Sequence, residues 1–73
     1  NIISVKNSLD IDNSGKDSFV IYMCVGGDGV QLKGEDFSEN LNYGETILLP
    51  ASLNKFELES IGNSELLEIY ISN

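Results

Sequence analysis

The chain has 73 residues, with twelve Asp or Glu against four Lys, and its formal net charge is −8. This charge repels nucleic-acid phosphates and anionic lipid headgroups, so neither nucleic acid nor a membrane surface is expected as a partner. A chain of this length has a thin core, and such domains usually need a disulfide, a metal or a partner for ordinary stability.

The first segments show alternation with a period of two. Ile3 with Val5, and Leu9 with Ile11, are separated by polar residues, which predicts two short strands that each have one solvent-exposed face. Residues 12–15, DNSG, then predict a turn, because short polar side chains bond nearby backbone and glycine reaches positive φ.

Ser18 to Val25 reads SFVIYMCV and is apolar on both alternating sets of positions. A strand of this kind is typical of one that lies between two layers, with no face in water. Gly26 to Gly29 contains three glycines and predicts a hairpin turn, after which Val30 and Leu32 begin the return strand.

The segment Gly34 to Asn40 is polar apart from Phe37 and predicts a connecting loop. The stretch Leu41 to Leu58 predicts three strands, separated by a turn at Gly44 and by a corner after Pro50, which lacks the N–H for ladder pairing. Its last strand alternates acidic residues with Phe56 and Leu58.

Gly62 to Ser64 predicts the last turn, and Leu66 to Ser72 predicts the last strand. Leu67, Ile69 and Ile71 fall on one face of it, and Leu66, Glu68 and Tyr70 on the other. Turns that recur every 8 to 12 residues, without helical periodicity, predict an all-β sandwich or barrel.

The single cysteine cannot form an internal disulfide, and free thiols persist in reducing compartments, so a cytoplasmic location is expected. The longest apolar run is far shorter than the ~20 residues of a membrane-spanning helix. The chain begins at Asn1 without methionine, from which we expect a piece of a longer polypeptide.

Three phrases carry a family resemblance: the strand that ends in CVGG at Gly27, the phrase GETILLPAS from Gly44 to Ser52, and the terminal LLEIYIS. A glycine and a proline separated by five residues, as at Gly44 and Pro50, also form the front half of the second cupin motif. From Phe19 onward the chain resembles the C-terminal domain of type I mannose-6-phosphate isomerases. The resemblance implies a small jelly-roll or cupin-like β-sandwich or barrel spanning residues 1–73.

Cupins often bind a metal through two histidines and a glutamate of their first motif and one histidine of their second. By the family spacing the glutamate falls on Val20, the second-motif histidine on Lys55 and the motif glycine on Ser52, and the chain has no histidine. The resemblance therefore implies a domain without catalytic, cofactor-binding or metal-binding residues. The resemblance also implies that zinc, and the interconversion of mannose 6-phosphate and fructose 6-phosphate, belong to an N-terminal catalytic domain of the parent chain.

Asp10, Asp12, Ser14 and Gly15 follow the pattern D-x-D-x-S-G, which opens a calcium-binding loop. The twelfth position of such a loop needs a bidentate glutamate, but Ile21 occupies it. We favour an acidic β-turn, and weak calcium binding by Asp10, Asp12 and Ser14 stays open.

Other chemically capable residues have simpler structural interpretations. We favour a buried structural thiol for Cys24, a solvated strand face for Lys55 and exposed carboxylates for the pairs Glu57/Glu59 and Glu35/Asp36. The tyrosines are candidates for stacking on a sugar, but we favour rings in the core with hydroxyl groups at its rim. They are Tyr22, Tyr43 and Tyr70.

The leading hypothesis is a metal-free, non-catalytic scaffolding domain of a mannose-6-phosphate isomerase. Its expected partners are the N-terminal catalytic domain of the parent chain and, in a homo-oligomer, further copies. The alternative is an independent acidic β-sandwich interaction module assisted by calcium. A stand-alone cupin that binds a small molecule is weaker, because no ionic or metal anchor is visible for a ligand.

Overall fold

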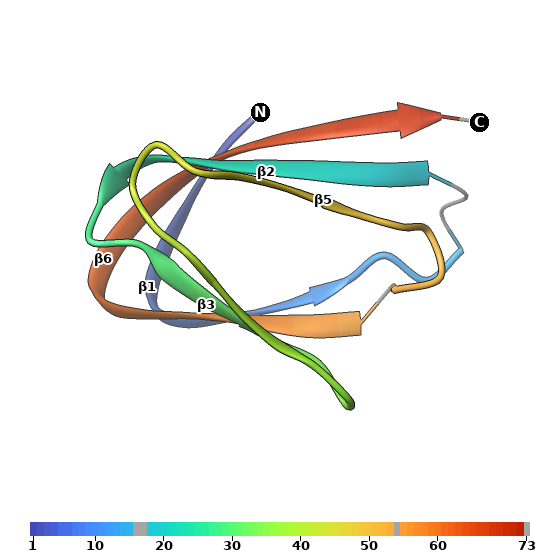
Figure 1. Ribbon diagram of the computed structural model, residues 1–73, viewed down its shortest axis with the longest axis horizontal. Helices are drawn as coiled ribbons and strands as arrows, with labels where there is room; N and C mark the ends of the chain where they lie inside the picture. Colours follow the sequence, from blue (N-terminus) through green and yellow to red (C-terminus); the bar gives the residue numbers. More distant parts are fainter. Residues whose placement is uncertain (16–17, 54, 73) are drawn as a thin grey trace.

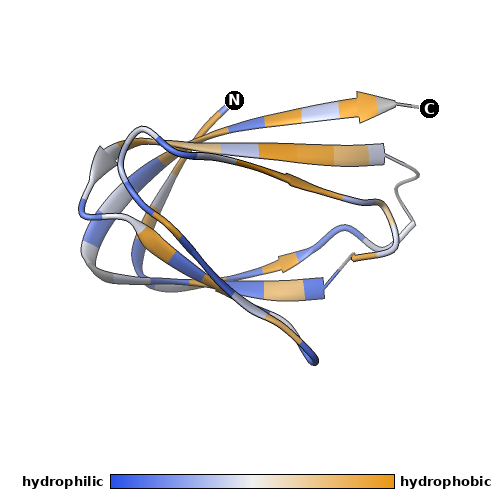
Figure 2. Ribbon diagram, viewed as in Figure 1, coloured by the Kyte–Doolittle hydropathy of each residue, from blue (hydrophilic) through white to orange (hydrophobic). Residues whose placement is uncertain are grey.

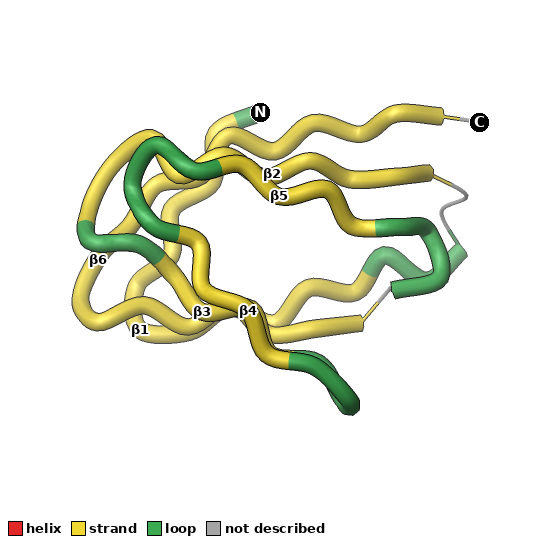
Figure 3. Tube along the Cα trace, in the orientation of Figure 1, coloured by secondary structure: helices red, strands yellow, loops and turns green. Residues whose placement is uncertain are grey.

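The structure is a computed structural model that describes residues 1–15, 18–53 and 55–72. Over these ranges the chain consists of strands and turns without a helix (Figure 3). The strands are β1 (Ile2–Asp12), β2 (Ser18–Gly27), β3 (Val30–Lys33), β4 (Ser38–Leu41), β5 (Thr46–Leu49) and β6 (Lys55–Ser72). The predicted all-β class is confirmed.

All strand pairs are antiparallel and belong to one sheet, in the order β4-β3-β6-β2-β5, with β1 paired to β6. This sheet folds over into two layers (Figure 1). The β2 layer, as we call it, contains β5, β2, the C-terminal part of β6 and the N-terminal part of β1. The β3 layer contains β4, β3 and the remaining parts of β6 and β1.

The strands β1 and β6 bend from one layer to the other. In β1 the register slips between Lys6 and Ser8, and Asn7 has a φ of 64°, which are the marks of a β-bulge. A bulge bends its strand and increases the local twist. At the bend of β6, Gly62 has a φ of 96°.

The strand pairing is that of a jelly roll. When the two halves of β1 and β6 are counted separately, the six strands become eight segments. The first segment pairs with the last, the second with the seventh, β2 with β5, and β3 with β4. Two four-stranded layers joined in this way form the double-sheet jelly roll, so the predicted small jelly-roll sandwich or barrel is confirmed.

Every strand contributes apolar side chains to the space between the layers. The ring of Tyr22 meets that of Phe56 edge-on, with centroids 6.0 Å apart and planes at 81°. This is a favourable geometry for an aromatic pair. The buried apolar residues are Val5, Val20, Tyr22, Cys24, Val30, Leu32, Leu41, Leu49, Phe56, Leu58 and Leu66.

The segment Gly26 to Gly29 is a corner between the layers, and the predicted hairpin at this place is wrong. The strands β2 and β3 do not pair with each other, because both lie beside β6 and run along it in the same direction. Gly27 and Gly29 permit this path with φ values of 81° and 101°. Turn residues indicate that the chain changes direction, but they do not indicate whether the strands before and after the turn pair with each other.

The loop predicted from Gly34 to Asn40 is also partly wrong, because Ser38–Leu41 forms β4. These polar residues form an edge strand on β3, where exposed polar side chains are tolerated. The turn of this hairpin is shorter, and within it the N–H of Gly34 donates to the carbonyl of Phe37 at 2.9 Å. Tyr43 lies in the turn after β4, outside the strand that was predicted for it.

Two predicted breaks lie within continuous strands. The gap between Val5 and Leu9 is part of β1, and the turn predicted from Gly62 to Ser64 is part of β6. Ser64 pairs with Val5 on one side and with Gly27 on the other, so ladder pairing continues through the bend. The polar residues mark the bends of these strands and do not end them.

The expectation that β2 is covered on both faces is wrong for the chain as the structure describes it. Val20, Tyr22 and Cys24 are buried between the layers, as expected. On the other face Met23 and Val25 are 37% and 39% exposed. The outer surface of the β2 layer is therefore apolar and in contact with solvent.

The corner at Gly27 gives a test of the fold. A Cβ at Gly27 would lie 2.2 Å from the carbonyl oxygen of Asn63 and 2.7 Å from Cα of Ser64, whereas a Cβ at Gly44 has nothing within 4 Å. Both glycines have a left-handed φ, so Gly44→Ala costs about 1–2 kcal/mol. We expect Gly27→Ala to cost at least ~2 kcal/mol more than Gly44→Ala, measured by urea denaturation, because β6 must also shift. Equal losses in the free energy of unfolding for the two variants would contradict the close approach of β6 to Gly27.

Candidate functional site

The outer surface of the β2 layer carries apolar side chains from neighbouring strands. Ile21 of β2 lies beside Ile69 of β6 and Leu48 of β5, and Met23 lies beside Leu67. Hydrophobic positions accordingly predominate in this layer (Figure 2). We name six exposed side chains the apolar face: Leu48 (59% exposed), Ile2 (54%), Ile71 (44%), Ile69 (43%), Val25 (39%) and Met23 (37%).

A continuous apolar face has a different meaning from isolated exposed apolar residues, which are normal on any surface. Contiguous patches on soluble proteins mark surfaces for protein partners, ligands or membranes. Glu65 and Lys6 are the charged residues at described outward positions of this layer, and both lie at its bend end. The rest of the apolar face is free of charge, which suits an uncharged protein surface.

Beneath the apolar face, β6 points a carboxylate into the core. Glu68 is only 6% exposed, and its Oε2 accepts a hydrogen bond from the Tyr22 hydroxyl at 2.6 Å. Its Oε1 accepts a second bond from Nδ2 of Asn1 at 3.2 Å. Burial raises the pKa of the Tyr22 hydroxyl, and the bond to Glu68 raises it further, so this hydroxyl stays protonated as the donor. The pair satisfies its own polar atoms inside the molecule.

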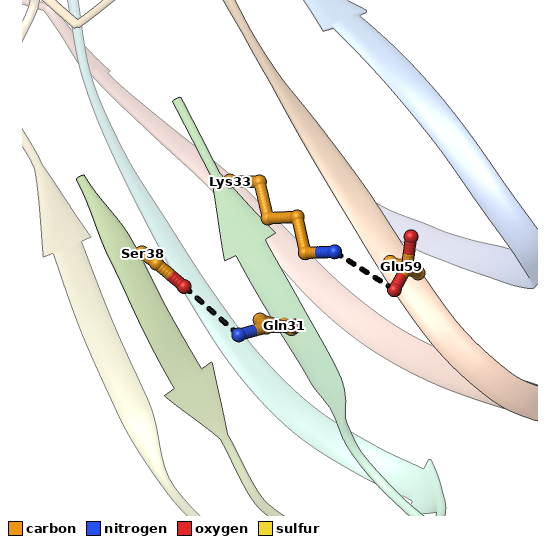
Figure 4. A network of polar contacts seen from close by, with 4 residues as sticks. All are labelled: Gln31, Lys33, Ser38 and Glu59. Atoms are coloured by element: carbon orange, nitrogen blue, oxygen red, sulfur yellow. Dashed lines mark hydrogen bonds and ion pairs between the residues drawn. The ribbon is translucent and has the colours of Figure 1, made fainter. Parts of the chain in front are cut away.

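The outer surface of the β3 layer carries charge instead of apolar groups. Nζ of Lys33 lies 3.0 Å from Oε1 of Glu59, and Nε2 of Gln31 donates to Oγ of Ser38 at 2.8 Å (Figure 4). The two ion-pair side chains are 41% and 47% exposed, so the pair contributes at most about 1 kcal/mol. This surface is a solvated acidic face.

A groove of about 310 Å³ lies at the edge of the β3 layer. Two of its lining side chains already have partners, since Gln31 bonds Ser38 and Glu59 pairs with Lys33. Most of the other lining side chains are exposed, and none of them is aromatic or cationic. The groove is lined by Asp28, Gly29, Val30, Gln31, Asn40, Asn42 and Glu59.

The calcium-like motif forms a turn that uses its own oxygen atoms. Oδ1 of Asp12 accepts hydrogen bonds from both the N–H and the hydroxyl of Ser14, at 2.9 and 2.5 Å. The bond from the Ser14 hydroxyl, with that from its N–H, lowers the pKa of Asp12. Asp10 lies in β1, opposite Glu57 of β6. Ile21, at the twelfth position of the motif, lies in β2. The geometry is that of the acidic turn we favoured.

The reactive residues named from the sequence lie apart from one another. Cys24 is fully buried with a free thiol, and its Sγ donates to the carbonyl of Gly26 at 3.4 Å. Lys55 is exposed on the outer side of the β3 layer, opposite Asp12. The predicted burial of Cys24 and the predicted exposure of Lys55 are confirmed.

The carboxylate pairs are placed as predicted, on the surface. Glu35 and Asp36 are exposed in the turn between β3 and β4. Glu59 is exposed and Glu57 is partly exposed on the acidic face. Neither pair has one buried and one solvated member, which is the asymmetry that general acid and base catalysis requires.

The three tyrosines occupy different environments and do not form one sugar-stacking surface. The Tyr22 hydroxyl is inside the core and not at its rim, and it donates a hydrogen bond to the buried Glu68 there. Tyr70 is 38% exposed and donates to Oδ1 of Asn13 at 3.1 Å. Tyr43 is 68% exposed in the turn after β4.

No group of three or more His, Cys, Asp or Glu is arranged to hold a metal ion within residues 1–15, 18–53 and 55–72. The same part of the chain contains no helix of the length and hydropathy that crossing a membrane requires. The sequence analysis did not identify the two features that distinguish this structure. These are the exposure of the apolar face and the burial of Glu68.

Comparison of the chain with models of protein families, with curated proteins and with solved structures finds no match.

The buried Tyr22–Glu68 pair gives a second prediction. Tyr22→Phe removes the hydrogen bond that the Tyr22 hydroxyl donates to the buried Glu68 carboxylate, so we expect a loss of about 1–3 kcal/mol in the free energy of unfolding. Tyr43→Phe removes a hydroxyl from an exposed turn and should change stability by less than about 0.5 kcal/mol. Urea denaturation at pH 7 measures both, and equal effects would show that the pair contributes nothing.

The same variant predicts a change in pH dependence. The pKa of Tyr22 is raised in the folded state, so above the ordinary tyrosine value near 10 only the unfolded chain loses this proton. Stability from Tyr22 is therefore complete below pH 10 and is lost as the pH rises further, by up to about 1.4 kcal/mol per pH unit. We expect a shallower decline for Tyr22→Phe between pH 9 and 11.5 in denaturation series, and parallel curves would contradict the assignment.

Proposed function

We propose that this chain is a non-catalytic scaffolding domain of a larger enzyme, of the type I mannose-6-phosphate isomerase kind. The observation that carries the proposal is the apolar face, an uncharged surface that provides a protein contact and no chemistry. The resemblance of the CVGG, GETILLPAS and LLEIYIS phrases supports the proposed identity of the enzyme. Its function is to pack against another protein surface and hold the assembly together, while the reaction belongs to the catalytic domain.

The positions where a cupin would carry metal ligands support a non-catalytic role. Val20, at the position of the first-motif glutamate, is a buried apolar core residue. Lys55, at the position of the second-motif histidine, faces outward, away from the space between the layers. Zinc takes nitrogen, sulfur and carboxylate ligands, and these two side chains offer none of them to the interior.

The physical reason for a scaffolding role is the small size of the core. A chain of 73 residues buries a modest fraction of its surface, so covering a further apolar face adds materially to its stability. Burial of apolar surface contributes about 25 cal/mol per Å² before the cost of association is subtracted. A domain that contributes a protein contact to a cytoplasmic zinc enzyme fits this requirement.

The proposal predicts that the purified 73-residue chain neither retains stoichiometric zinc nor interconverts mannose 6-phosphate and fructose 6-phosphate. Metal analysis by mass spectrometry and a coupled isomerase assay measure these, with an intact type I mannose-6-phosphate isomerase as the positive control. One zinc per chain, or isomerase activity that follows the purified protein, would refute the proposal. A melting temperature that rises in millimolar calcium would favour the independent calcium-assisted module instead.

A further inference from the structure

We infer that a second copy of this chain covers the apolar face, so that the domain joins two subunits through its β2 layers. This inference rests on the packing role proposed above and names the partner. It concerns a surface formed by four strand segments, from β5, β2, β6 and β1, whose register is defined in the structure.

The distribution of charge favours a second copy. Two chains of net charge −8 repel each other, and the repulsion is smallest when their charged surfaces point away from each other. The acidic face lies on the outer side of the β3 layer and the apolar face on the outer side of the β2 layer, and the two layers lie opposite each other (Figure 1). When the two copies meet through their β2 layers, the full thickness of both subunits lies between their acidic faces. A basic partner would instead be drawn to the β3 layer.

The geometry of sheets also permits self-association. Two sheets of the same twist pack face to face with their strands about 30° apart, and the two β2 layers are identical in twist. A two-fold axis in the interface that runs across the strands reverses the strand direction between the copies. This arrangement places the two Glu65 carboxylates, which lie at the bend end of the face, at opposite ends of the contact.

The pattern of β2 itself points to a missing layer. Its sequence is apolar on both faces, as in strands that are covered on both sides. The β3 layer covers only the row of Val20, Tyr22 and Cys24. In a face-to-face dimer the partner's β2 layer covers the remaining row, which includes Met23 and Val25, with side chains of the same aliphatic kind.

The size of the face sets the expected strength of the dimer. The layers lie one above the other in Figure 1, so each face extends along the longest and shortest dimensions of the molecule, 32 and 16 Å. This corresponds to roughly 500 Å² per subunit, compared with about 800 Å² for a standard stable interface. A weak, reversible dimer is therefore expected for the isolated chain.

Sedimentation equilibrium of the purified chain over roughly 10–1,000 μM tests the inference. The mass should rise from that of an 8.0 kDa monomer toward twice this value as the concentration increases. Ile69→Lys and Leu48→Lys place a charge in the face, and each should weaken association at least tenfold. Both positions are exposed, so the lysine stems can be accommodated in the fold, which circular dichroism verifies.

The matched control is Tyr43→Lys, which changes the net charge equally at an exposed turn and should dimerise like the natural sequence. A chain that stays monomeric at 1 mM would overturn the inference that a second copy is the partner. So would a Tyr43→Lys variant that self-associates as weakly as Ile69→Lys. A monomeric chain that binds the separate zinc domain of a type I isomerase, and loses this binding in Ile69→Lys, would also overturn it, while the scaffolding role would stand. A dimer with isomerase activity would refute the scaffolding role alone.

Discussion

The fold depends on the bend of β6, where a small group of buried polar atoms holds the two layers together. The hydroxyls of Ser60 and Ser64 lie 3.2 and 2.8 Å from the carbonyl oxygen of Gly29 and 2.8 Å from each other. Both serines are buried, so this carbonyl at the β2–β3 corner is satisfied without water. Because β6 pairs with β1, β2 and β3, its bend determines where each layer begins.

Beyond this bend, the alternation of β6 determines which surface is apolar. Leu66 and Glu68 point inward, and Leu67, Ile69 and Ile71 therefore point outward. The buried carboxylate is acceptable because Tyr22 and Asn1 donate to it. A slip of one residue would bury the aliphatic row and expose Glu68, but it would also separate the donors from this carboxylate and Ser64 from Gly29. The internal hydrogen bonds of Glu68 and Ser64 thus fix the register of β6, and this register places its aliphatic side chains on the outer surface.

The sequence predicted the strand content and the all-β class because alternation and turn chemistry are local properties, and the jelly-roll arrangement was expected from the family resemblance. It also placed Cys24, Lys55 and the carboxylate pairs correctly, since each was assigned by its own neighbours. It did not predict the corner at Gly27 or the continuity of β6, because these depend on strand pairs distant in sequence. The exposure of the apolar face was missed for the same reason. The two-sided apolar pattern of β2 indicates that both faces of the strand are covered, but it does not indicate whether the covering layer comes from the same chain.

The central claim is that the apolar face is a contact surface while the acidic face remains in water. Methyl NMR with a soluble paramagnetic probe tests it most directly, through the solvent accessibility of Met23, Leu48 and Ile69. The account predicts that these methyl groups become protected as the chain is concentrated or joined to its parent enzyme, while Leu9, which is 36% exposed in the β3 layer, is unchanged. Equal accessibility of the Met23, Leu48 and Ile69 methyl groups under all these conditions would contradict it.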